Sequence, residues 1–116
     1  MHELSITRNV VAIVGQHARG RLVRRVTLEI GVLAAVVPDA VRFCFDVVST
    51  GTPLAGAELV IDQVPASGTC RACGATFAVE RPVAVCGCGA RDVAVRGGDE
   101  LKTRSMELHQ ETAPCA

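Results

Sequence analysis

Four of the six cysteines in the chain form two close pairs. Cys70 and Cys73 have the spacing C-x-x-C, Cys86 and Cys88 have the spacing C-x-C, and a glycine follows each pair. Twelve residues separate the two pairs. Tetrahedral zinc needs four soft ligands, and two short loops can present two thiolates each. The pattern therefore predicts a structural zinc site, and its full set of protein ligands leaves no open position for catalysis.

The cysteine pairs also allow other interpretations. The thiols could be free and buried, or Cys70 and Cys73 could act in a thiol oxidoreductase. The redox interpretation requires a cysteine of low pKa at the start of a helix, and the glycine-rich loop offers no such helix. A C-x-C loop can place both sulfurs on one metal with less slack than C-x-x-C. Zinc is nevertheless the favoured interpretation, because four clustered cysteines beside glycines have no core in which to lie.

The chain opens with Met1, His2 and Glu3. The α-amine, the imidazole and the intervening amide nitrogens can surround one metal ion, and nitrogen-rich planar coordination suits Ni(II) or Cu(II). From composition alone, an ordinary solvated terminus explains the tripeptide equally well.

The remaining cysteines and histidines give weaker signals. Cys44 lies on the apolar face of a predicted helix and is expected to be a small core residue. Cys115 is expected to be a free thiol in the tail. His17 and His109 have no partner at ligand spacing, which favours a place at the surface or the edge of the core.

Composition limits the class of protein. The 116 residues are 49% hydrophobic but only 3% aromatic, so the core must use small aliphatic side chains and would benefit from a metal as a staple. Twelve basic residues balance twelve acidic ones, which argues against nucleic acid as a partner. The sequence shows no signal peptide and no membrane-spanning run, so we expect a cytoplasmic protein with no membrane partner.

The elements that must position these residues follow from hydrophobic periodicity. A helix is predicted over Leu4–Ala18, with an inner face made by Ile6, Val10, Ile13 and Val14. A strand follows at Val26–Ile30. A second helix starts at Pro38 and closes at Gly51, with an inner face of Val41, Cys44, Phe45 and Val48.

Two further strands are predicted at Glu58–Asp62 and Leu101–Leu108, the latter with a bulge between Thr103 and Met106. The sequence between them is rich in Gly, Ala and Cys. We therefore predict an α+β fold in which two helices pack on a three-stranded sheet, with a small inserted zinc-ribbon-like lobe. The connections near Pro65 and Gly98 would act as a double hinge.

The whole layout resembles the HypA/HybF family of hydrogenase nickel-insertion proteins, over essentially the full chain. The opening tripeptide and the paired cysteines, in this order, are the specific features. The other matching segments are Val26–Gly31, Phe43–Val48, Gly56–Leu59 and the strand Leu101–Leu108.

The resemblance implies a nickel metallochaperone that is not an enzyme. It implies Ni(II) bound by the amine of Met1 and by His2, with Glu3 and nearby backbone contributing, and structural Zn(II) bound by the paired cysteines. The implied nickel-binding lobe comprises residues 1–66 plus 99–116, and the zinc-binding lobe residues 67–98. The family usually has C-x-x-C in its second pair, so Cys86 is displaced by one position and is the best candidate for the fourth ligand.

The implied partners are a nickel-handling GTPase and the large subunit of [NiFe]-hydrogenase. In some organisms the family also serves urease maturation. We expect a monomer or a weak homodimer. The alternative function is a small zinc-ribbon adaptor that binds protein without nickel, and metal analysis of untagged protein would separate the two.

Overall fold

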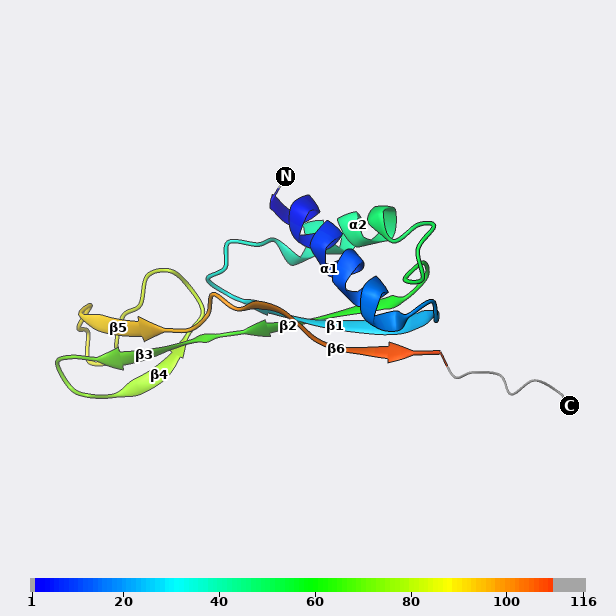
Figure 1. Ribbon diagram of the computed structural model, residues 1–116. Helices are drawn as coiled ribbons and strands as arrows, with labels where there is room; N and C mark the ends of the chain where they lie inside the picture. Colours follow the sequence, from blue (N-terminus) through cyan, green and yellow to red (C-terminus); the bar gives the residue numbers. More distant parts are fainter. Residues whose placement is uncertain (1, 110–116) are drawn as a thin grey trace, which may run out of the picture. The chain divides into compact units, whose positions relative to one another are not determined.

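The computed structural model describes residues 2–109, so Met1 and Cys115 lie outside the described residues. The chain forms two helices and two three-stranded sheets, with strand orders β2-β1-β6 and β4-β3-β5 (Figure 1). The elements are α1 (His2–Ala18), β1 (Val23–Gly31), α2 (Pro38–Val48), β2 (Glu58–Val64), β3 (Ala66–Cys70), β4 (Thr76–Val79), β5 (Val93–Arg96) and β6 (Leu101–Leu108). The predicted α+β class with two helices is confirmed. Within the described residues, neither helix combines the length and apolar character that a membrane crossing requires.

The chain divides into two compact units. The first contains the residues up to Leu28, Val37–Val60 and the residues from Thr103 onward, and the second contains Glu29–Val36 and Ile61–Lys102. The predicted zinc-binding lobe, residues 67–98, lies inside the second unit. Three of the four unit boundaries fall within β1, β2 and β6, and the fourth lies between Val36 and Val37.

The buried face of α1 differs in part from the predicted one. Its buried residues are Ile6, Thr7, Val11, Val14 and Ala18. Ile13 is 50% exposed, so its prediction as an inner residue was wrong. The buried face of α1 is centred on Thr7, whose hydroxyl donates to the carbonyl of Glu3 at 2.6 Å. Because that bond satisfies the hydroxyl, a polar residue can occupy a core position that the apolar pattern did not reveal.

The strand and helix that follow agree closely with the sequence pattern. β1 is longer than predicted, and its Val26, Leu28 and Ile30 are all buried. α2 begins at Pro38 as predicted, and it buries Val41 and Phe45. Cys44 and Val48 are half-buried, which places them at the edge of the same face. The two helices pack against each other within the first unit (Figure 1).

The second unit contains three strands that the sequence analysis did not predict. β3 is the central strand and pairs antiparallel with both β4 and β5. Gly68 in β3 lies where a Cβ would come within 2.7 Å of Val79 and 2.9 Å of Val93. The missing side chain therefore lets these two valines pack over the central strand. Strands of four or five residues are too short to show the alternation that reveals a strand in sequence.

Candidate metal centre

The first cysteine pair occupies a tight turn between β3 and β4. The N–H of Cys70 donates to the carbonyl of Ala75 at 2.9 Å, and the N–H of Gly74 donates to the carbonyl of Cys70 at 2.9 Å. Gly74 has φ of +79°, a conformation that disfavours other residues. The turn also brings the N–H of Cys73 to 3.5 Å from Cys70 Sγ. Such N–H donors stabilise the thiolate of a metal-binding cysteine.

The second pair repeats this arrangement in a loop one residue shorter. The N–H of Cys86 donates to the carbonyl of Ala90 at 2.9 Å, and the N–H of Gly89 donates to the carbonyl of Cys86 at 2.8 Å. Gly89 has φ of +92°. The two hydrogen bonds of the first turn are therefore retained when the spacing shrinks to C-x-C, which brings Cys88 close to Cys86.

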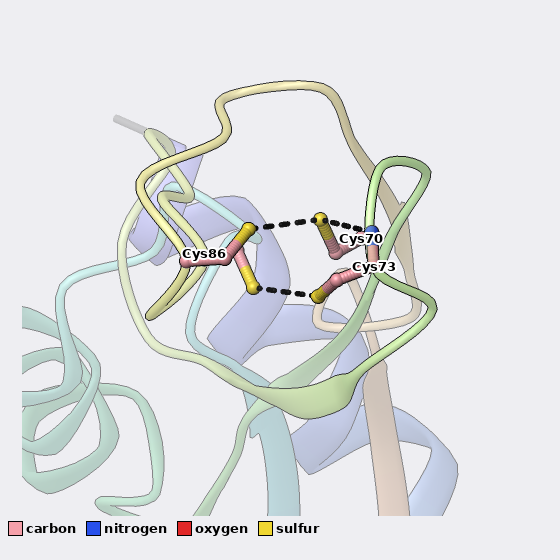
Figure 2. A group of neighbouring side chains, drawn as sticks. Cys70, Cys73 and Cys86 are labelled. Atoms are coloured by element: carbon pink, nitrogen blue, oxygen red, sulfur yellow. Dashed lines mark hydrogen bonds between the residues drawn. The ribbon is translucent and has the colours of Figure 1, made fainter.

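The two turns bring all four sulfurs together (Figure 2). Cys70 Sγ lies 3.7 Å from Cys88 Sγ, and Cys73 Sγ lies 3.5 Å from Cys86 Sγ. All four ligand atoms lie within 4.8 Å of one another. Zinc–sulfur bonds of about 2.3 Å in a tetrahedron require sulfur–sulfur distances of about 3.8 Å. The donor set and its spacing therefore fit a tetrahedral four-thiolate metal site.

The first cysteine of each pair is buried and the second is exposed: Cys70 and Cys86 against Cys73 and Cys88. The backbone N–H of Cys73 is the main cause that lowers the pKa of Cys70 to about 6. At Cys86 the backbone N–H of Cys88 lowers the pKa, but the Cys73 side chain and burial outweigh it and raise the pKa to about 12. One thiol thus ionises more readily than its neighbour, and a bound cation would favour the thiolate form of all four cysteines.

Other candidate ligands do not join this cluster. Within residues 2–109, the four cysteines are the one set of three or more His, Cys, Asp or Glu side chains placed to share a metal. The Nδ1 of His17 lies 2.8 Å from the carbonyl of Ile13, one turn back in α1. The N–H of His109 donates to the carbonyl of Leu22 beyond the end of β6. Both histidines are exposed, as the sequence predicted.

The amino-terminal residues lie in the first unit, at the start of α1. His2 is the first helical residue and its side chain is exposed, whereas Glu3 is half-buried. The Glu3 carboxylate accepts a hydrogen bond of 3.4 Å from the N–H of Val37. Its own backbone N–H and then that of Val37 lower the pKa of Glu3. The contact with Val37 joins residues 34 positions apart, and no local sequence signal announces it.

A family model described as HypA, hydrogenase/urease nickel incorporation, metallochaperone, matches residues 1–108. The chain belongs to the HypA family. The HypA-family match includes the opening tripeptide, both cysteine pairs and the end of β6, as the resemblance suggested. The family is one of hydrogenase maturation factors and nickel metallochaperones.

Individual HypA proteins agree over nearly their whole length. The hydrogenase maturation factor HypA of Nostoc sp. is 51% identical over 110 residues, covering 95% of this chain and 97% of the relative. The HypA of Geobacter metallireducens is 48% identical over 109 residues, covering 93% and 99%. The Ni metallochaperone HypA from Helicobacter pylori, solved in solution, has the same fold, with a TM-score of 0.63 at 23% identity, covering 94% of this chain and 98% of that one.

Proposed function

We propose that this chain is a nickel metallochaperone that carries Ni(II) at its amino terminus and holds structural Zn(II) at its four-cysteine cluster. Nickel would be bound by the α-amine of Met1 and the imidazole of His2, with Glu3 and the adjacent backbone contributing. The observation that carries the proposal is the family match beginning at residue 1, together with an exposed His2 at the first position of α1. Planar nitrogen coordination of this kind is typical of Ni(II).

The zinc part of the proposal rests on the chemistry of the cluster. Four thiols within 4.8 Å supply soft ligands in the number that structural zinc uses. Zinc supplies the positive charge that holds four neighbouring sulfurs as thiolates. The residues that would hold it are Cys70, Cys73, Cys86 and Cys88. Because the protein would fill every coordination position, zinc here stabilises the loops instead of activating a substrate.

The nickel would be delivered to the large subunit of [NiFe]-hydrogenase, in concert with a nickel-handling GTPase. The support is the family: relatives at 51% and 48% identity carry the name hydrogenase maturation factor. The family description also includes urease, so a urease maturation system is a second destination to test. A cytoplasmic location is part of the same proposal.

The decisive experiment is nickel titration of zinc-loaded, untagged protein in three forms: wild type, His2→Ala, and a variant with one residue added before Met1. Wild type should bind nickel stoichiometrically. His2→Ala and the extension should both lose specific binding, since one removes the imidazole and the other converts the amine to an amide. An extended protein that binds nickel as well as wild type would refute the terminal site and favour the zinc-ribbon adaptor.

A further inference from the structure

The amino end of α2 lacks a cap from its own sequence. Val37 occupies the N-cap position and offers no side-chain hydrogen bond to the helix. Most helices place Ser, Thr, Asp or Asn here, because a side-chain oxygen can accept a bond from a free N–H. Pro38 follows at the first helical position and has no N–H to satisfy. The N–H of Val37 donates a hydrogen bond, and the acceptor belongs to a residue that is distant in sequence.

That residue is Glu3, in the first turn of α1. Glu3 Oε2 lies 3.4 Å from the N–H of Val37. The carbonyl of the same glutamate accepts the hydroxyl of Thr7 at 2.6 Å, and Thr7 is buried in the core of the first unit. The Glu3 side chain is thus hydrogen-bonded to the residue that precedes α2, and its backbone carbonyl is hydrogen-bonded within α1. Its neighbour His2 has an exposed side chain.

A carboxylate suits the amino end of α2 on electrostatic grounds. The helix macrodipole places partial positive charge there, and a nearby anion stabilises it. Turning the carboxylate towards a metal at the terminus would leave the Val37 N–H without this acceptor and remove the anion from the helix end. The contact therefore favours a glutamate that stays on α2 while the residue before it binds the metal.

We propose that the Glu3 carboxylate is a positioning group for nickel and not a ligand: it fastens the first turn of α1 to the amino end of α2 and so orients His2 and the terminal amine. This inference rests on the proposed nickel site and assigns the role of one of its three residues. The hydrogen bond is the larger part of this role and the charge at the helix end the smaller part, so a neutral amide oxygen can replace the carboxylate with little loss.

Substitutions of Glu3 separate positioning from ligation. Glu3→Gln keeps an oxygen within reach of the Val37 N–H and should hold the nickel dissociation constant within about threefold of wild type. Glu3→Ala removes the acceptor and should weaken nickel binding about tenfold. If Glu3→Gln binds as poorly as Glu3→Ala, the negative charge or direct ligation matters and the proposal is wrong.

Val37 permits the converse test with Glu3 intact. Its φ of −88° and ψ of 114° lie near the range of proline, so Val37→Pro removes the donor N–H with little backbone change. Val37→Pro should weaken nickel binding as much as Glu3→Ala does. The matched variant Val37→Ala keeps the N–H and trims a side chain that is 57% exposed, so it should bind like wild type. Combining Glu3→Ala with Val37→Pro should add no further loss.

A direct measurement of the hydrogen bond between Glu3 and Val37 remains informative even if one of the variants misfolds. Hydrogen exchange at the Val37 amide, followed by NMR in the full zinc-loaded chain without nickel, should be slow in wild type and Glu3→Gln and faster in Glu3→Ala. Equal exchange in all three would overturn the proposal even if Val37→Pro failed to fold. Failure of the nickel site itself would look different, because wild type and the one-residue extension would then bind nickel equally whatever the Val37 amide does.

Discussion

Cys73 Sγ lies 3.5 Å from Cys86 Sγ, and the two residues come from different turns of the second unit. The distance is far longer than a disulfide bond of about 2.05 Å and close to the sulfur spacing around tetrahedral zinc. The pairing crosses between the two turns, since Cys70 likewise approaches Cys88. A metal bound here would cross-link both turns at once, and the stability of the sheet between them should depend on it.

Removal of zinc should unfold the β3-β4-β5 sheet while α1 and α2 stay folded. From Ala66 to Gly98 the buried hydrophobic residues are Ala66, Cys70, Val79 and Cys86. Two of these four are proposed ligands, so little apolar burial remains to hold the sheet without metal. NMR spectra recorded before and after treatment with a strong chelator should lose the dispersed signals of β3, including Gly68. Retention of those signals in zinc-free protein would contradict the prediction.

Zinc affinity should fall as pH falls, and more steeply below pH 6. Zinc must displace the proton of Cys86, whose pKa is raised to about 12, at every pH used. Cys70, with its pKa lowered to about 6, is already ionised at neutral pH and takes up a proton below it. Competition titrations between pH 5 and 8 should therefore show an added dependence on proton concentration below pH 6. In Cys70→Ser this change of slope should vanish, and a slope unchanged in wild type would contradict the prediction.

The sequence predicted the elements whose side chains follow a clear period. The alternation at Val26 and Leu28 and the proline that opens α2 are local signals, and the structure confirms both elements. Thr7 broke the pattern in α1 because its burial depends on a hydrogen bond to Glu3 that hydropathy does not encode. The strands around Gly68 were not predicted, because glycine allows close packing without leaving an apolar pattern in the sequence.

In the candidate sites too, some features could be predicted from the sequence and others could not. The four cysteines were predicted from spacing, and they lie together in the structure. The contact between Glu3 and Val37 depends on how α1 packs against α2, and tertiary contacts of this kind cannot be deduced from local spacing. The predicted bulge between Thr103 and Met106 and the double hinge remain predictions.

Replacement of Arg25 should destabilise the first unit in a salt-dependent manner. Arg25 lies on β1, the central strand, and its guanidinium contacts Glu58 at 3.0 Å and Glu107 at 2.5 Å on the two edge strands. Its side chain is 33% exposed, so we expect Arg25→Ala to lower the free energy of unfolding at low salt and to lower it less in about 1 M NaCl, where the ion pairs are screened. Urea unfolding at both salt concentrations measures this, with Arg24→Ala as the exposed neighbouring control. An equal loss at both concentrations would assign the effect to packing instead.

Alanine should have opposite effects at Gly15 and Gly31. In α1, a Cβ at Gly15 would meet its nearest neighbour, Leu54, at 4.0 Å, so Gly15→Ala should stabilise the protein by about 0.5–1 kcal/mol through lower entropy of the unfolded chain. At Gly31, a Cβ would overlap the carbonyl of Gly98, which also accepts the N–H of Leu33 at 2.6 Å. Because the clash is between a Cβ and backbone atoms, only a backbone shift can relieve it, so Gly31→Ala should lower the free energy of unfolding by about 3 kcal/mol. Urea unfolding of both variants in zinc-saturated protein makes the comparison. A Gly31→Ala protein as stable as wild type would show that the close approach of these two segments is not required for folding.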